Sequence, residues 1–265
     1  MNTFHNKVIW ITGASSGIGE ALSLAMAREG ANLILSSRRT EELERVRNQC
    51  TSPSNRCSIH PFDLSDTSQI DQLTARILKE FGTIDYLINC GGISQRSYAK
   101  DTPIETDRKI MEVNFWGSVA VTKSVLPIML EKKSGHIIVI SSISGKFGFF
   151  LRSAYSASKH ALHGFFESLR LEVFKDNIKV TLVCPGKINT SIAHNALNEK
   201  GEKSKSSAIS SYRGLSPEEC ANQIIKAIKK NKAEVFIGGK ELRAIAIKRL
   251  FPSLFFKLIQ KQKVE

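Results

Sequence analysis

Short apolar runs rich in β-branched residues alternate along this chain with longer segments of helical periodicity. The apolar runs predict seven strands: Val8–Thr12, Asn32–Ser36, Cys57–Pro61, Tyr86–Asn89, Gly135–Ser141, Lys179–Val183 and Glu234–Ile237. The helical segments between them are Ile18–Glu29, Glu41–Gln49, Gln69–Phe81, Thr106–Glu131, Ala157–Lys175 and Pro217–Lys230. Apolar strands joined by helical crossovers form a parallel sheet that helices cover on both faces. We therefore expect an α/β fold, a single doubly wound domain of about seven strands.

Composition excludes several other classes. The chain has 265 residues, of which 42% are hydrophobic and 24% charged, so disordered and collagen-like chains are excluded. Its formal charge of +13 is unusual. Most of the excess lies in residues 201–265, which hold 14 basic and 6 acidic side chains. An excess of this kind indicates binding to one of three partners: nucleic acid, an anionic membrane, or an anionic ligand such as a nucleotide phosphate.

Cysteine and histidine usage favours neither disulfides nor a metal site. The five cysteines are odd in number and lack the spacing of zinc ligands, which predicts free thiols in a reducing compartment. His160 and His163 have no cysteine or carboxylate nearby in sequence, so we expect both on a helix surface, with no metal. Neither a signal-peptide pattern nor an uncharged apolar run of spanning length is present, and we expect a cytoplasmic protein.

A glycine-rich turn follows the first predicted strand. It reads Thr12-Gly-Ala-Ser-Ser-Gly-Ile-Gly19, directly before a predicted helix. Glycines here permit a tight turn and leave room for a pyrophosphate, which the N-terminus of the helix would attract. A turn of this kind also occurs for structural reasons alone. Its place between the first strand and an amphipathic helix favours dinucleotide binding.

The end of the second predicted strand distinguishes the two nicotinamide dinucleotides. A carboxylate about 20 residues beyond the glycines favours NAD, whereas an arginine favours the 2′-phosphate of NADP. Here the chain reads Leu35-Ser-Ser-Arg-Arg39, with no acidic residue before Glu41. Bidentate contacts between arginine and phosphate are strong, so we predict NADP(H), with Ser37 and Arg38 at the 2′-phosphate and Arg39 beside them. The alternative is a pair of solvated arginines at a helix start.

Tyr155 and Lys159 lie four residues apart, on one face of a predicted helix. A phenol is a poor base at neutral pH, and a neighbouring ammonium favours its ionised form. Proton exchange with an alcohol or carbonyl needs that form. Ser142, thirteen residues before Tyr155, has a hydroxyl suited to hold the reacting oxygen.

With these motifs in order, the sequence resembles the short-chain dehydrogenase/reductases from about Lys7 to Thr190, and most closely their hydroxysteroid and retinol dehydrogenase-like branch. The resemblance implies a Rossmann-like fold. The family's adenine-contacting aspartate matches Asp63, followed by Leu64, and its motif after the fourth strand matches Asn89-Cys-Gly-Gly92. Its catalytic asparagine matches Asn114, and the segment that holds the nicotinamide matches Pro185–Thr190.

The resemblance also implies roles for the four catalytic residues. Tyr155 would be the general acid/base and Ser142 would orient the substrate oxygen. Lys159 would lower the pKa of Tyr155 and bind the nicotinamide ribose, while Asn114 would hold a water that links Lys159 to solvent. The expected cofactor contacts are Gly13, Ser15, Ser16, Gly17, Ile18, Gly19, Ser37, Arg38, Asp63, Leu64, Asn89, Gly91, Tyr155, Lys159, Pro185, Gly186, Ile188 and Thr190.

Two adjacent positions depart from the family pattern. Cys90 and Gly91 replace the usual asparagine and alanine after the fourth strand, so the hydrogen bonds of that asparagine are lost. A thiol beside the cofactor is a candidate redox-sensitive position, but a buried inert cysteine is the simpler interpretation.

On the substrate side, residues 145–153 contain Phe147, Phe149 and Phe150. They predict an apolar pocket for a steroid-, retinoid- or lipid-like carbonyl or alcohol, or else they pack in the core or between subunits. A segment at about 188–215, with the Ser/Lys-rich run 200–211 inside it, predicts a lid that closes over substrate.

Residues 240–265 form a basic amphipathic extension after a catalytic domain of residues 1–239. Apolar residues recur at three- and four-residue spacing among lysines and arginines, and Pro252 predicts two short helices. One interpretation is peripheral contact with a membrane surface. The other is a helix packed on a subunit partner or beside the substrate mouth.

Together these features predict an NADP(H)-dependent oxidoreductase that interconverts a ketone or aldehyde and an alcohol by hydride transfer. An NADPH-binding redox sensor or regulator with little turnover is the alternative. No zinc-finger, helix-turn-helix or RNA-binding motif is present, so we expect no nucleic-acid partner. The resemblance implies a homodimer or homotetramer.

Overall fold

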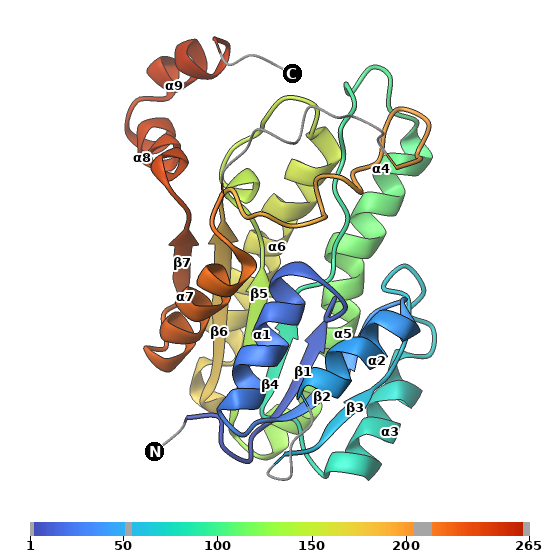
Figure 1. Cartoon of the computed structure of the whole chain (residues 1–265). Coiled ribbons are helices and arrows are strands. Elements are labelled where there is room, and N and C mark those ends of the chain that lie inside the picture. The colour runs from blue at the N-terminus through green and yellow to red at the C-terminus, as the bar shows by residue number, and fades with distance from the viewer. Residues whose placement is uncertain (1–2, 51–54, 204–213, 262–265) are drawn as a thin grey trace.

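A seven-stranded parallel sheet forms the centre of the molecule (Figure 1). The structure is a computed structural model and describes residues 3–50, 55–203 and 214–261. The strand order is β3-β2-β1-β4-β5-β6-β7. The strands are β1 (Val8–Thr12), β2 (Asn32–Ser36), β3 (Cys57–Ile59), β4 (Tyr86–Asn89), β5 (Gly135–Ile140), β6 (Ile178–Pro185) and β7 (Glu234–Ile237).

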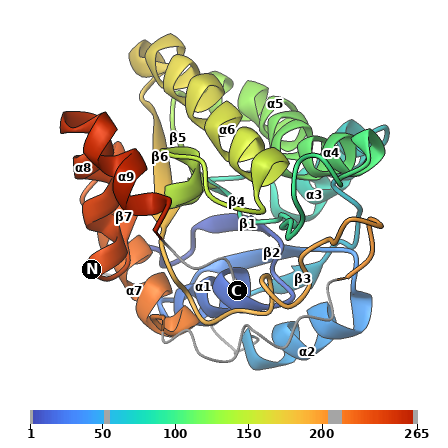
Figure 2. The ribbon, with the colours of Figure 1, turned by 90° about the horizontal axis from the view of Figure 1, so that it is seen from above.

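Helices cover both faces of the sheet, as Figure 2 shows from above. On one face lie α1 (Gly17–Arg28), α2 (Thr40–Cys50) and α7 (Pro217–Lys229). On the other lie α3 (Ile70–Phe81), α5 (Gly117–Glu131) and α6 (Ser153–Glu172). The expected doubly wound α/β fold is therefore confirmed.

The two cores follow from the alternation of side chains along each strand. In β1, Ile9 and Ile11 pack into the core under α1, α2 and α7, whereas Val8 and Trp10 pack into the core under α3, α5 and α6. Side chains of a strand point to opposite faces in turn, so a strand buried on both faces must be apolar throughout. All five residues of β1 are buried.

The position of β1 determines where a ligand binds. The chain passes from β1 outward through β2 and β3, then returns to place β4 on the other side of β1. Where the winding reverses, the loops after β1 and β4 turn away from each other and leave a crevice at the carboxyl ends of the strands.

The predicted strands agree with the observed ones to within two residues, and the helices differ more. The helix expected at Ala157–Lys175 begins at Ser153, so Tyr155 lies within its first turn. The helix expected at Thr106–Glu131 is interrupted. It consists of α4 (Ile104–Met111), a π-helical turn (Glu112–Trp116) and α5.

That same stretch is the one helix in the described part of the chain that is long and apolar enough to cross a membrane by length and composition. Half of its most apolar window is buried inside the molecule. The helix packs on the sheet through residues such as Val121 and Val125, as the core helices of globular domains do.

Two short helices end the described chain, α8 (Arg243–Leu250) and α9 (Pro252–Ile259). The break falls at Pro252, which is the first residue of α9, as predicted. A proline is tolerated at that position because its missing N–H has no partner inside the helix.

Candidate active site

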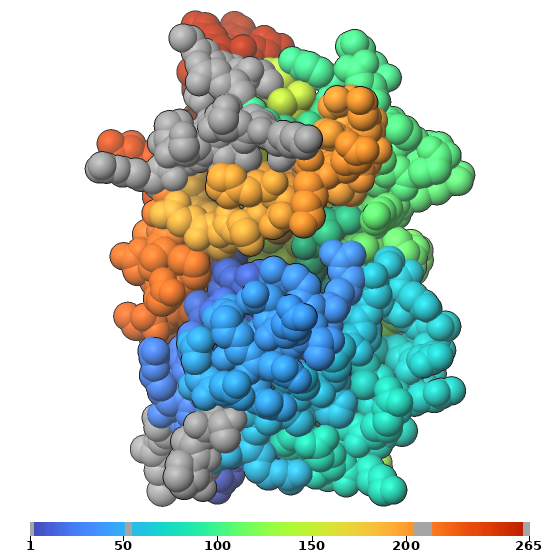
Figure 3. All heavy atoms as spheres, turned by 45° about the vertical axis from the view of Figure 1, so that its right-hand side comes forward, coloured from blue at the N-terminus to red at the C-terminus, as the bar shows by residue number. Residues whose placement is uncertain are grey.

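A cleft of about 600 Å³ opens at the carboxyl ends of the strands. It is lined by the turn after β1, the end of β2, the loop after β4, the end of β5, α6 and the segment after β6. Figure 3 shows the segment after β6, in orange, lying directly above the blue N-terminal part of the chain. The cleft is thus at the crevice that the strand order predicts.

The glycine-rich turn is packed too tightly for side chains. Gly13 has a φ of +68°, and a Cβ added to it would lie 2.7 Å from the Cα of Gly91. Gly17 has a φ of +60°, a backbone angle that residues with a Cβ rarely adopt. The turn therefore brings bare backbone and the first N–H groups of α1 to the cleft, which suits a pyrophosphate.

Two arginines stand at the end of β2, on the same side of the cleft. The Arg39 guanidinium (Nη2) donates hydrogen bonds to the hydroxyls of Ser15 (3.0 Å) and Ser16 (2.8 Å). The Nη1 of Arg38 lies 3.7 Å from a carboxylate oxygen of Asp63, and its side chain is 56% exposed. Both cations line the cleft, so they bring positive charge to the place where an adenosine ribose would lie.

Tyr155 and Ser142 meet at the other end of the cleft. Both residues are buried and line the cleft. Burial raises the pKa of Tyr155, while the charge of Arg152 and the nearby hydroxyl of Ser142 oppose that rise. Ser142 caps a short turn by accepting a hydrogen bond from the Ser144 N–H (3.1 Å). Two hydroxyls therefore lie on the same wall of the cleft.

Lys159 lies one helical turn beyond Tyr155. Its Nζ is 5.8 Å from the centre of the Tyr155 ring and donates a hydrogen bond to the carbonyl oxygen of Ile140 (2.9 Å). Burial lowers the pKa of Lys159 to about 8. The expected role of Lys159 in lowering the pKa of Tyr155 stays a prediction, since Arg152 is the cation whose charge acts on that phenol in this structure.

Asn114 lies in the π-helical turn and does not line the cleft. Its Oδ1 accepts the Ile93 N–H (2.8 Å), and its Nδ2 donates to the Ile93 carbonyl (2.9 Å) and to Ser158 (3.0 Å). A Cβ on Gly92 would lie 3.1 Å from Asn114 Oδ1 and 3.7 Å from Lys159 Nζ. Asn114 thus joins the loop after β4 to α6, close to Lys159.

Two residues near Tyr155 were missed by the sequence analysis. The buried Gln95 accepts the N–H groups of Ala154 (2.9 Å) and Tyr155 (3.3 Å) through its Oε1, and so caps the first turn of α6. Arg152 bonds to Ser94 (2.5 Å), and its guanidinium lies 5.7 Å from the Tyr155 ring centre. No local pattern marks either residue, because their partners lie about 60 positions away in the sequence.

Most of the predicted cofactor contacts line the cleft. Three predicted residues do not line it: Gly19, Asn89 and Asn114. Gly19 packs against Gly13, and Asn89 donates to Thr122 (2.9 Å), so these residues support the site from behind. The predicted residues that do line it are Gly13, Ser15, Ser16, Gly17, Ile18, Ser37, Arg38, Asp63, Leu64, Gly91, Ser142, Tyr155, Lys159, Pro185, Gly186, Ile188 and Thr190.

The phenylalanines expected on the substrate side do not line this cleft. Phe147 is buried and packs edge-on against Phe255 of α9 at 5.2 Å between ring centres. For Phe147 the alternative, packing in the core, is therefore correct. The apolar walls come instead from Ile93 and Val113, and from Ile192 and Leu197 in the segment that was expected to form a lid.

The segment expected to form a lid is described at residues 188–203 and 214–215. It lines the cleft through Thr190, Ile192 and Asn195, and Leu197 pairs with Gln95 in an isolated bridge. Residues 204–213, which include most of the Ser/Lys-rich run, lie outside the described residues. Closure of the lid stays a prediction.

Cys90 lies in the cleft wall, after β4. Burial raises the pKa of its thiol to about 12. Reactive cysteines need a lowered pKa and access to solvent, so this environment favours an inert thiol over a redox sensor.

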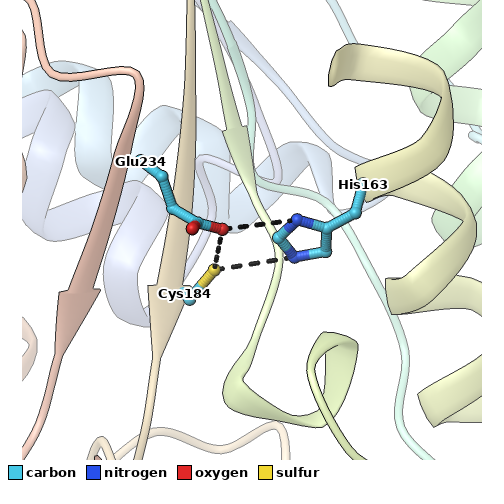
Figure 4. Close-up of side chains that lie close together, drawn as sticks. All are labelled: His163, Cys184 and Glu234. Carbon is cyan, nitrogen blue, oxygen red and sulfur yellow. Dashed lines mark hydrogen bonds and ion pairs between the residues drawn. The ribbon is translucent and has the colours of Figure 1, made fainter. Parts of the chain in front are cut away.

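The expectation that His163 lies on a helix surface is wrong. Figure 4 shows its buried ring beside Cys184 of β6 and Glu234 of β7, with Sγ 3.6 Å from Nε2 and the carboxylate 3.5 Å from Nδ1. These three groups are close enough to hold a metal ion. The Lys146 ammonium, however, lies 2.6 Å from the same oxygen of Glu234 and supplies a positive charge to it. We interpret the cluster as a partly buried polar network around the ion pair of Lys146 and Glu234.

Comparisons with known proteins agree with this geometry. The model of the short chain dehydrogenase family matches residues 7–201. A "Dehydrogenase/reductase SDR family protein 7-like" from Anopheles gambiae is 45% identical over 264 residues, 97% of this chain and 83% of that protein. A short-chain dehydrogenase from Streptomyces avermitilis has a TM-score of 0.81 at 28% identity, with 96% of each chain covered.

A third protein shares the fold and was solved with a cofactor. A short chain dehydrogenase/reductase from Burkholderia phymatum, in complex with NAD, has a TM-score of 0.85 at 22% identity, covering 100% of this chain and 99% of that one. The family model covers more than two thirds of this chain, and the Anopheles protein is 45% identical over nearly all of it. The chain therefore belongs to the short-chain dehydrogenase/reductase family and is an oxidoreductase.

Proposed function

We propose that this chain is an NADP(H)-dependent dehydrogenase/reductase that interconverts a carbonyl and an alcohol on an apolar substrate. The observation that carries the proposal is the pair of hydroxyls, Ser142 and Tyr155, at one end of a cleft whose other end holds Arg38 and Arg39. One end suits proton exchange with an oxygen, and the other suits a phosphate.

The residues at the nucleotide end fit such a cofactor. The glycine turn leaves backbone N–H groups open to a pyrophosphate, and no carboxylate follows β2 where a 2′-hydroxyl would need one. Asp63 pairs with Arg38, but its side chain is 39% exposed, so it remains accessible to an adenine. A bound nicotinamide would supply or accept the hydride.

The chain's own groups handle the proton and the oxygen. Tyr155 would give its proton to the substrate oxygen in reduction and accept one in oxidation, and Ser142 would hold that oxygen by a hydrogen bond. Lys159 would stabilise the phenolate through its charge. The apolar substrate is supported by Ile93, Val113, Ile192 and Leu197 on the cleft wall.

A turnover assay tests the proposal. The purified chain is given NADPH or NADH with a panel of steroid, retinoid, quinone and sugar carbonyls, and the loss of reduced cofactor is followed by absorbance. We expect turnover of apolar carbonyls with NADPH preferred. A preference for NADH would overturn the cofactor, and activity confined to sugars would overturn the substrate class.

Tyr155→Phe is the matched control, because it removes one hydroxyl and keeps the ring. It should abolish turnover and leave NADPH binding, measured by quenching of protein fluorescence, within about twofold of wild type. Retained turnover would refute the role of Tyr155.

A further inference from the structure

Helices α8 and α9 expose an apolar surface that the catalytic chemistry does not use. Five of the thirteen large hydrophobic side chains that are exposed among the described residues fall within the nine positions 250–258. They are Leu250, Phe251, Leu254, Phe256 and Leu258, each between 45% and 68% exposed. We call this set the tail surface. Single exposed apolar residues are normal, but a cluster marks an interaction site.

The helices that carry the tail surface are positively charged. Residues 243–261 carry five basic side chains, Arg243, Lys248, Arg249, Lys257 and Lys261, and no acidic one. A short helical segment with exposed Leu and Phe among Lys and Arg has the composition of segments that lie at the interface of a bilayer. Anionic headgroups attract such cations, and the apolar side chains enter below them.

The tail surface is fixed to the rest of the molecule at defined points. Phe255, on the inner side of α9, is buried against Phe147, and Lys248 donates a hydrogen bond to the carbonyl oxygen of Lys146 (2.8 Å). Both contacts reach the loop that follows Ser142. Figure 1 shows the two helices beyond the carboxyl end of β7. The cleft is lined at the same edge of the sheet, by the segment after β6.

A second anchor joins the start of this region to the cleft rim. The Glu241 carboxylate accepts the N–H of Lys187 (2.9 Å), next to Gly186 and Ile188, which line the cleft. Contacts with both Glu241 and Lys248 hold the tail surface beside the cleft. A bilayer in contact with α8 and α9 would therefore lie close to the opening through which substrate enters.

The charge favours a lipid surface over a second copy of the chain. A symmetric contact through the tail surface would bring two copies of the same patch together, each with five cations and no acidic side chain to pair with them. Like charges facing each other oppose association, whereas anionic headgroups neutralise them.

We propose that α8 and α9 form a docking surface for an anionic lipid bilayer, with the exposed Leu and Phe side chains inserted between headgroups and the surrounding Lys and Arg side chains paired with them. Docking does not depend on turnover. It would leave the cleft open toward the bilayer, which is the phase where apolar carbonyls and alcohols concentrate.

Vesicle sedimentation of the full-length chain tests this proposal. One set of vesicles is phosphatidylcholine alone, and the other contains phosphatidylglycerol as the anionic lipid. We expect binding to the anionic vesicles, at least tenfold weaker binding to the neutral ones, and weakening as salt is added. Absence of sedimentation with anionic vesicles at low salt would overturn the proposal.

Matched variants identify the surface. The double variant L254E/F256E and the charge-reversal variant R249E/K257E should each lose at least tenfold in binding to anionic vesicles. The control L171E/F174E alters two residues near the end of α6 that are 79% and 77% exposed, and it should bind as wild type does. Equal binding by L254E/F256E and wild type would also overturn the proposal.

Two further measurements distinguish lipid binding from misfolding and from self-association. Circular dichroism and turnover should be the same in L254E/F256E and wild type, because the altered side chains are exposed and do not line the cleft. Light scattering should give the same assembly for both. If the variant instead dissociates an oligomer and no chain sediments with vesicles, the tail surface binds a second copy, and the lipid proposal is wrong.

Discussion

Lys159 donates a 2.9 Å hydrogen bond from its Nζ to the carbonyl oxygen of Ile140, while Tyr155 has its ring centre 5.8 Å from the same nitrogen. The ammonium is thus held at the end of β5 beside the phenol. Because the ammonium is buried, its pKa falls to about 8. Lys159 therefore loses its charge at a pH at which an exposed lysine is still protonated.

We therefore expect carbonyl reduction to decline above about pH 8 in the wild-type chain. The Lys159→Arg variant keeps a positive charge at high pH, since guanidinium does not titrate there. Its kcat should be lower at pH 7, but its decline should begin about one pH unit higher. Profiles of kcat against pH for the two proteins measure this. Identical profiles would mean that the charge of Lys159 does not govern the decline.

Arg152 offers a second test of the charge around Tyr155. Its charge opposes the rise that burial causes in the pKa of Tyr155, so removing it should raise that pKa further. Alcohol oxidation needs the phenolate, and the Arg152→Gln variant should reach half-maximal oxidation about one pH unit higher than wild type. Arg152→Lys should restore most of the profile.

The neighbouring Arg96 supplies the control for this prediction, because it carries the same charge and does not line the main cleft. The Arg96→Gln variant should keep the wild-type profile. If Arg152→Gln also keeps it while Tyr155→Phe is inactive, the charge of Arg152 has no part in the ionisation of Tyr155.

The two arginines after β2 should differ in their effect on cofactor preference. Arg38 is exposed apart from its pair with Asp63, so we expect it to reach a 2′-phosphate. Arg38→Ala should raise the KM for NADPH by roughly 10- to 100-fold, because one hydrogen bond to a charged group is lost. It should leave the KM for NADH unchanged. Arg39 holds the hydroxyls of Ser15 and Ser16 in the turn that both cofactors would use. Arg39→Ala should therefore raise both KM values.

Arg45→Ala is the control for both variants, because its guanidinium pairs with Glu20 and Glu42 outside the cleft. It should change neither KM. An equal effect of Arg38→Ala on NADPH and NADH would contradict the assignment of Arg38 to the 2′-phosphate.

The sheet and the nucleotide end could be predicted because their signals are local. The β1 run Val8–Thr12 is apolar throughout and is followed at once by three glycines in a fixed spacing. Both the fold and the place of the cleft follow from such short segments, since parallel strands meet at one edge of the sheet.

Features that depend on distant contacts could not be predicted. The start of α6 at Ser153 rather than Ala157 depends on Gln95, which caps the helix from 59 residues away. The π-helical turn coincides with the bonds that Asn114 makes to Ile93 and Ser158, and the apolar pattern runs through it without a break. His163 was misplaced for the same reason, because its partners come from β6 and β7.

His136 predicts how stability changes with pH. It lies in β5, 4% exposed, beside Thr181 at 2.8 Å. Thr181 donates its own proton to the carbonyl oxygen of Lys232, so it accepts one from a neutral His136. Burial, and then the charge of Lys179, lower the pKa of His136 to about 4. In the unfolded chain the pKa of His136 is about 6.5. As pH falls, the unfolded state therefore binds the proton before the folded state does.

The contribution of His136 is therefore fully present above about pH 6.5 and is lost progressively toward pH 4. Between pH 7.5 and 5.0 it should lower the free energy of unfolding by roughly 2 kcal/mol. The His136→Gln variant, with an amide that donates to Thr181 and does not titrate, should lose that part of the decrease in urea unfolding. The exposed His160→Gln is the control and should keep the full decrease. If His136→Gln shows the wild-type difference between the two pH values, His136 is not held neutral by burial.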